Sequence, residues 1–235
     1  MASTTTAATA TAAHEEAHHP PHLQHHFVSS EQQFDAAKMG MWLFLITEIL
    51  LFSGMFVAYT VYRAWHPEVF AQASDLLDWR LGGLNTIVLL GSSLTVALSI
   101  HYAQKNDQRK MILNLALTLV AAGIFMVVKY FEYTGKFDAG IFPGAAFDPQ
   151  GVYHGHDLAE YNVPYAPQFF SIYFVMTGIH GVHVLVGMGI FTWLITRAVR
   201  GHFNSEYYTP VELSGLYWHL VDIIWIFLFP LLYLI

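Results

Sequence analysis

Five long apolar runs, separated by polar segments, account for most of this chain. A run of about twenty apolar residues is long enough, as a helix, to cross a hydrocarbon core of roughly 30 Å. The pattern therefore predicts an all-α fold, a polytopic membrane bundle of five transmembrane helices. We expect the spans at residues 39–62, 81–102, 111–133, 168–197 and 213–235.

Two polar segments lie outside these spans. Residues 1–38 contain no apolar run and carry six histidines between His14 and His26, so we expect a disordered, His-rich cytoplasmic tail. Metal loading by these imidazoles is the alternative. Residues 134–167 contain four prolines and are expected to form a long external loop, either a binding surface or poorly ordered.

The composition is that of a membrane protein. Hydrophobic residues make up 55% of the chain and charged residues 11%, against about 25% charged residues in soluble domains. The net charge of −7 implies no nucleic-acid partner. The chain has no cysteine, which excludes disulfides, thiolate haem ligation, iron–sulfur clusters and cysteine-based copper sites within it.

Basic residues predict the orientation of the spans in the membrane. The tail and the segments after the second and fourth spans hold six basic residues, whereas the opposite side holds three, Arg63, Arg80 and Lys136. Basic segments favour the cytoplasmic side. We therefore expect a protein of the bacterial inner membrane with its N-terminus in the cytoplasm and its C-terminus outside, which places the acidic segments 63–80 and 134–167 outside.

Glu48 is the one charged residue of the first span. It lies about ten residues into the helix, hence roughly 15 Å deep, where an ionised carboxylate is costly. We expect it to be protonated and hydrogen-bonded to another span, with His183 or the face of Asp222 as candidate partners. One interpretation is a structural acid; the other is a site for protons or lipid contacts.

Other polar side chains fall within the spans at helical spacing. His180 and His183 are three residues apart and share a face with Thr177, which should point into protein because lipid cannot satisfy imidazole nitrogens. Small residues recur every seven positions in the second span and predict a packing seam. We expect buried polar packing from His180, His183, His219, Asp222 and Glu132, with Glu132 paired to Lys129.

Four blocks of sequence resemble subunit III of the haem–copper respiratory oxidases. They read KMGMWLFLITEILLFSGMF, LNTIVLLGSSLTVALSIHYA, TGIHGVHVLVG and YWHLVDIIWIFLF, and they occur in the order typical of that family. The last two are the most specific. Many members have seven spans and a V-shaped cleft that holds phospholipid. This chain lacks the first two of those helices, as in the five-span short forms.

The resemblance implies a role and a set of residues. Subunit III carries no haem or copper and has no catalytic, cofactor-binding or metal-binding residue of its own. It packs against subunit I, which holds the oxygen-reducing centre, and supports its proton uptake and stability. By motif position, Glu48 matches the family's buried cleft glutamate, and Arg197 and Arg200 match basic residues that meet lipid phosphate.

The resemblance also implies partners. These are subunit I, subunit II with other subunits of the respiratory complex, and phospholipids, with haem and copper in the partner subunits. The electron donor stays open between cytochrome c, which could meet the external acidic segments, and a quinol. The chain is thus expected to be a non-catalytic subunit of a cytochrome c oxidase, with a quinol oxidase as the alternative.

Two more distant functions use the same polar residues. A b-type cytochrome would ligate haem through histidines, but this needs two imidazoles at one depth on opposed faces, and His180 and His183 share a face. A proton or ion transporter would use Glu48 and Asp222. Transporters often contain internal repeats and interrupted helices, and neither is evident in this sequence.

Overall fold

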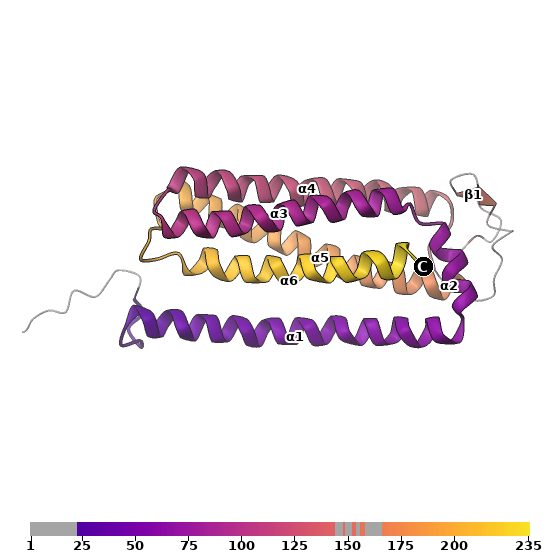
Figure 1. Ribbon diagram of the computed structural model, residues 1–235, viewed down its shortest axis with the longest axis horizontal. Helices are drawn as coiled ribbons and strands as arrows, with labels where there is room; N and C mark the ends of the chain where they lie inside the picture. Colours follow the sequence, from indigo (N-terminus) through magenta and orange to yellow (C-terminus); the bar gives the residue numbers. More distant parts are fainter. Residues whose placement is uncertain (1–22, 144–147, 149–151, 154–155, 158–165) are drawn as a thin grey trace, which may run out of the picture.

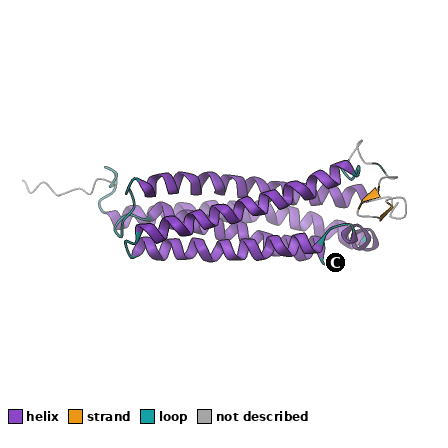
Figure 2. Cartoon of the chain, turned by 90° about the horizontal axis from the view of Figure 1, so that it is seen from above, coloured by secondary structure: helices purple, strands orange, loops and turns teal. Residues whose placement is uncertain are grey.

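The computed structural model describes residues 23–143, 148, 152–153, 156–157 and 166–235. Five helices in it are long and apolar enough to cross a membrane, and they run side by side along one axis (Figure 1, Figure 2). The predicted all-α fold with five spans is confirmed. These helices are α1 (Ser30–Trp65), α3 (Trp79–Gln104), α4 (Gln108–Asp138), α5 (Ala166–Val199) and α6 (Thr209–Tyr233).

The helices extend beyond the predicted spans. Helix α1 begins at Ser30, where the Ser29 hydroxyl caps it by accepting a hydrogen bond from the Gln32 amide. The expected disordered tail of residues 1–38 is therefore wrong for residues 30–38, and residues 1–22 lie outside the described residues. Hydropathy marks the part of a helix that sits in lipid, whereas capping decides where the helix ends.

One helix was not predicted. Helix α2 (Pro67–Asp75) lies within the segment between the first two spans, with proline in its first turn. It buries Val69, Phe70 and Ala73 against the bundle. The Ser74 hydroxyl donates a hydrogen bond to the carbonyl oxygen of Ile235, so α2 lies over the end of α6. We call this side of the molecule the α2 end.

The segment 134–167 is shorter as a loop than expected. Helix α4 continues to Asp138 and α5 begins at Ala166. Between them, β1 (Val152–Tyr153) and β2 (His156–Asp157) pair antiparallel, and most of the remaining loop lies outside the described residues. All other regular structure in the described part of the chain is helical.

Helices α3 to α6 form the packed part of the protein, and α1 lies against its outside (Figure 1). Helix α1 buries only three side chains, Leu45, Phe52 and Tyr59, spaced seven residues apart. This spacing puts them on one narrow stripe. Helix α1 is therefore attached along a single seam, and the rest of its surface is exposed to whatever surrounds the bundle.

The turn between α3 and α4 lies at the opposite end from α2. Asp107 caps α4 by accepting a hydrogen bond from the Lys110 amide, and its carboxylate lies 2.9 Å from the Lys110 ammonium. The side-chain hydrogen bond from Lys110 lowers the pKa of Asp107. The capping carboxylate is therefore ionised at neutral pH. Helix α4 follows α3 after a short turn.

Candidate functional site

Glu48 of α1 meets His183 of α5 where these two helices face each other. The Glu48 Oε2 atom lies 2.8 Å from His183 Nε2, and each side chain is 16% exposed. The other ring nitrogen, Nδ1, lies 2.8 Å from the carbonyl oxygen of Ile179. A carbonyl oxygen only accepts, so Nδ1 must carry a hydrogen. The hydrogen bond to Glu48 then requires one further hydrogen between Oε2 and Nε2.

Aromatic rings surround this pair. The His183 ring lies 5.3 Å from the ring of Phe52 and 6.4 Å from that of Tyr217. The Tyr217 hydroxyl donates to the His183 carbonyl oxygen at 2.9 Å. The imidazole also lines an apolar groove of about 260 Å³ between α1, α5 and α6, together with Phe44 and Val186. The pair is thus the polar contact of an otherwise apolar seam.

Two further polar contacts hold α1. The Tyr59 hydroxyl donates to the carbonyl oxygen of Leu231 near the end of α6. At the other end of the helix, the Lys38 ammonium lies 2.8 Å from a Glu212 carboxylate oxygen. Helix α1 is therefore tied to the bundle near each end and, through Glu48, in the middle.

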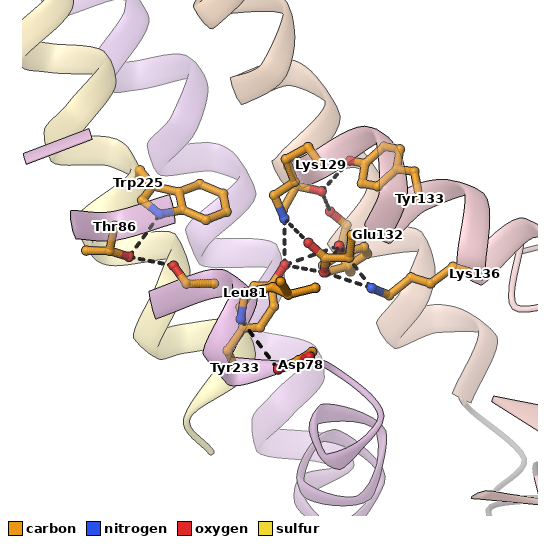
Figure 3. Close-up of polar contacts among 12 residues, drawn as sticks. Asp78, Leu81, Thr86, Lys129, Glu132, Tyr133, Lys136, Trp225 and Tyr233 are labelled. Atoms are coloured by element: carbon orange, nitrogen blue, oxygen red, sulfur yellow. Dashed lines mark hydrogen bonds and ion pairs between the residues drawn. The ribbon is translucent and has the colours of Figure 1, made fainter. Parts of the chain in front are cut away.

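A buried ionic cluster lies inside the bundle at the α2 end (Figure 3). Glu132 of α4 accepts hydrogen bonds from the ammonium groups of Lys129 and Lys136, each at 2.8 Å. It also accepts from the hydroxyls of Tyr173 in α5 at 2.7 Å and Tyr233 in α6 at 2.6 Å. Glu132 is 3% exposed and Lys136 is fully buried. One carboxylate thus joins three helices.

Aromatic faces complete the surroundings of Lys129. Its ammonium lies 4.7 Å from the ring centre of Trp225 and 5.1 Å from that of Tyr233. The negative face of an aromatic ring attracts a cation, more strongly when both are desolvated. The Trp225 indole in turn donates to the Thr86 hydroxyl of α3 at 3.1 Å (Figure 3). The cluster therefore extends to α3 through one tryptophan.

The predicted pairing of Lys129 with Glu132 is confirmed, but its extent was missed. The i, i+4 spacing of Glu132 and Lys136 was a signal in the sequence. Tyr173 and Tyr233 gave none, because their approach depends on how α5 and α6 pack against α4.

The predicted polar residues of α5 and α6 lie in different surroundings. His180 is fully buried, with its ring 5.5 Å from that of Phe125 and 5.2 Å from that of Trp225. His183 instead reaches α1. His219 Nδ1 lies 2.7 Å from the Ser93 hydroxyl oxygen. Asp222 is 2% exposed. His183, not the Asp222 face, is therefore the partner of Glu48.

The predicted packing seam of the second span is confirmed. Asn85, Ser92 and Ser99 of α3 are all buried. The Ser92 hydroxyl accepts a hydrogen bond from the Trp218 indole at 2.9 Å, and the Ser99 hydroxyl donates to the Val96 carbonyl oxygen. The seam brings α6 close to α3.

The two predicted lipid-binding arginines lie at the end of the bundle away from α2. Arg197 is in the last turn of α5, with its guanidinium 5.1 Å from the ring centre of Trp193. Arg200 follows the helix, and both side chains are exposed. Within the described part of the chain, neither forms an ion pair, so both guanidinium groups present free donors at this surface.

The histidines and acids that the two more distant functions would use lie in separate surroundings. His180 contacts Phe125 and Trp225, His183 contacts Glu48, and His219 contacts Ser93. Glu48 is bonded to His183 rather than to Asp222. The described residues also contain no group of three or more histidines and acids placed to hold a metal ion.

Five spanning helices, a buried ionic cluster and buried polar seams define a polytopic α-helical membrane protein. Residues 22–147 and 152–235 match the family model of cytochrome c oxidase subunit III. The chain therefore belongs to the cytochrome c oxidase subunit III family and is a subunit III of a haem–copper oxidase.

Named relatives agree with this assignment. The chain is 31% identical to cytochrome c oxidase subunit 3 of Thermostichus vulcanus, over 86% of this chain and 88% of that protein. It is 29% identical to a probable quinol oxidase subunit 3 of Staphylococcus haemolyticus, over 84% and 88% respectively. It is also 31% identical to cytochrome c oxidase subunit 3 of Gadus morhua, over 83% of this chain and 68% of that protein.

Proposed function

We propose that this chain packs against subunit I of a haem–copper oxidase and sustains its activity during turnover, with no redox chemistry of its own. The observation that carries the proposal is the hydrogen bond between Glu48 and His183. Near the middle of α1, it is the only polar contact among the described residues that joins α1 to another spanning helix. Of the five spanning helices, α1 has the smallest buried share.

We propose that a partner subunit covers the exposed apolar surface of α1. In lipid, helices associate through packing and interhelical hydrogen bonds rather than through exclusion of water. Helix α1 presents large apolar side chains on several faces, among them Leu43, Ile46 and Leu50. Its position relative to α5 and α6 decides the shape that another helix would meet. We propose that the Glu48–His183 contact keeps this shape, and through it the fit onto subunit I and proton uptake there.

Phospholipid is the second proposed ligand. A guanidinium group matches the fork geometry of phosphate oxygens, and long basic side chains reach toward headgroups while their stems stay in apolar surroundings. Arg197 and Arg200 are exposed at the end of a span and are placed for such a contact. Acyl chains would then lie along the apolar surface of α5.

The electron donor and the orientation remain part of the proposal. We favour a cytochrome c oxidase in a bacterial inner membrane, with subunit II as a further partner and cytochrome c approaching the acidic external segments. A quinol oxidase is the second candidate, because one relative bears that name. The basic residues favour a cytoplasmic N-terminus and an external C-terminus.

The proposal is tested by replacing Glu48 in the intact complex and following oxygen consumption over time. Glu48→Ala removes the bond and leaves Nε2 of His183 unpaired in an apolar seam, a local cost of about 1–3 kcal/mol. We expect an ordinary initial rate and faster loss of activity during sustained turnover. Glu48→Gln keeps the shape and a donor, so its decay should stay close to that of the wild type.

Two results would contradict the proposal. Decay of the Glu48→Ala complex at the wild-type rate would remove Glu48 from any role in sustaining activity. An abolished initial rate in Glu48→Gln would indicate an obligatory proton carrier instead of a stabilising contact. A matched control is Thr47→Val, which changes the neighbouring exposed residue whose hydroxyl donates only to its own helix.

A further inference from the structure

Three buried polar side chains in the bundle lack direct hydrogen-bond partners among the described residues. They are Asn85 of α3, His180 of α5 and Asp222 of α6. In each of them, both polar side-chain atoms are buried without a hydrogen-bond partner. Their exposures are 0%, 0% and 2%. Leaving such groups unsatisfied is costly, and native structures rarely do so without a bound water or ion.

The register of α3 against α6 places two of these side chains at neighbouring levels. The two helices run antiparallel, with Trp225 bonded to Thr86 and His219 close to Ser93. Asp222 lies on α6 between those two contacts, so it faces α3 between Thr86 and Ser93. Asn85 adjoins Thr86 on the same stretch. The Ser93 hydroxyl, which contacts His219, also lies close enough to Asp222 to interact with its carboxyl group.

His180 reaches the same level from α5. Its ring lies 5.2 Å from that of Trp225, and Trp225 is one turn beyond Asp222 on α6. Phe125 of α4 contacts both rings, with its ring centre 5.5 Å from that of His180 and 4.9 Å from that of Trp225. His180 thus packs on Trp225, Asp222 lies one turn from Trp225 on the same helix, and Asn85 is the chain neighbour of Thr86, which Trp225 binds.

The adjoining ionic cluster does not satisfy them. The Lys129 ammonium lies over Trp225 but donates to Glu132 and to the Tyr233 hydroxyl, at 2.8 and 2.6 Å. The Trp225 indole is used by Thr86. A small molecule able both to donate and to accept would complement all three side chains.

We propose that Asn85, His180 and Asp222 enclose an internal hydration site, in which bound water bridges α3, α5 and α6. An amide, an imidazole and a carboxyl group together present donors and acceptors in every direction, and water complements both. Buried waters typically make about three hydrogen bonds to polar groups that would otherwise be unsatisfied. A bridging water is nearly as favourable as a direct bond, so the site would cross-link three spans far from bulk solvent.

A cation is the competing occupant. The Asp222 carboxylate and the Asn85 amide oxygen are also ligands that Na⁺ accepts. The imidazole of His180 favours water, because hard cations select oxygen ligands. The two occupants differ in their response to the ionic composition of the buffer.

The first test is a map of the intact oxidase complex at a resolution that shows ordered water. We expect density within hydrogen-bonding distance of at least two of Asn85, His180 and Asp222. Direct hydrogen bonds among these three side chains, without intervening density, would overturn the proposal. So would a thermal midpoint that depends on exchanging Na⁺ for K⁺, because that would identify a cation.

The second test measures coupling between two members of the site. Asn85→Leu, His180→Leu and the double variant are compared by thermal midpoint of the intact complex. Both single variants should lose stability, and the double variant should lose less than the sum, because either change already disrupts the bridging water. Additive losses would contradict a shared site. Ser99→Ala is the control, since this buried hydroxyl bonds only to its own helix, and it should show no coupling. If a variant fails to assemble, the map decides.

Discussion

Glu132 illustrates how one side chain can bind several spans together. It accepts from two ammonium groups on its own helix and from two tyrosine hydroxyls on other helices. Charge-assisted hydrogen bonds are about twice as strong as neutral ones. A buried pair offsets the cost of desolvating its charges only when its remaining donors and acceptors are also satisfied, and the tyrosines meet that condition here.

We predict that Glu132→Gln destabilises the protein by about 3 kcal/mol or more. The change keeps the shape but leaves two buried ammonium groups beside a neutral amide, and breaking a buried ion pair costs about 3–5 kcal/mol. The thermal midpoint of the purified complex measures the loss. Asp138→Asn is the matched control on the exposed end of the same helix and should leave the midpoint unchanged. Equal midpoints for wild type and Glu132→Gln would show that the cluster adds no stability.

The sequence predicts individual polar residues unevenly. Glu48 lies in mid-span and therefore needs a hydrogen-bond partner on another helix. Because only a few polar groups lie at its depth, His183 could be named as a candidate. Lys129 and Glu132 are neighbours on one helix and could be paired from spacing. Tyr173 and Tyr233 could not be assigned to them, since a tyrosine in a span is equally compatible with an interface or a core.

At the scale of elements, apolar length predicted the five spans but not their ends. Helix α1 begins at Ser30 because Ser29 caps it, and residues 30–38 form helix without an apolar pattern. Helix α2 was missed because nine residues are too short for a clear period. Its apolar residues find their partners only when the ends of α5 and α6 are brought beneath it.

Close packing of α5 against α6 gives a prediction at the same scale. A Cβ atom on Gly187 would lie 2.5 Å from a ring atom of Trp218. That ring cannot move freely, because its indole nitrogen is bonded to Ser92. We expect Gly187→Ala to destabilise the protein by about 1–3 kcal/mol in thermal unfolding. Gly189→Ala, with nothing within 4 Å of the added atom, should be neutral, and a similar loss in both variants would refute the packing argument.

The end of α5 gives a second prediction for an element. Arg197→Ala should reduce the phospholipid that stays bound to the purified complex, because it removes an exposed guanidinium next to Trp193. Arg197→Lys retains the charge without the fork, so it should retain part of the lipid. Quantifying lipid phosphorus per complex checks both. Unchanged phospholipid in Arg197→Ala would exclude this arginine as a headgroup ligand.

At the scale of the whole molecule, most of the apolar surface of α1 is not covered by the rest of the bundle. Helices α3 to α6 bury polar residues against one another, whereas only 11% of the most apolar 18-residue stretch of α1 is buried. A membrane protein tolerates this in lipid, but the seam that holds α1 depends on few contacts. Association with another subunit would cover this surface and restrict the movement of α1.

The central claim is that this chain works as part of a haem–copper oxidase, and purification through the chain itself tests it most directly. An affinity tag on the chain, with mild solubilisation of the native membrane, should recover a complex with haem absorbance and oxygen consumption. After subunit I is removed, the chain should show no Soret band. Recovery of the chain without any haem–copper subunit, or a Soret band that persists in the isolated chain, would contradict the account.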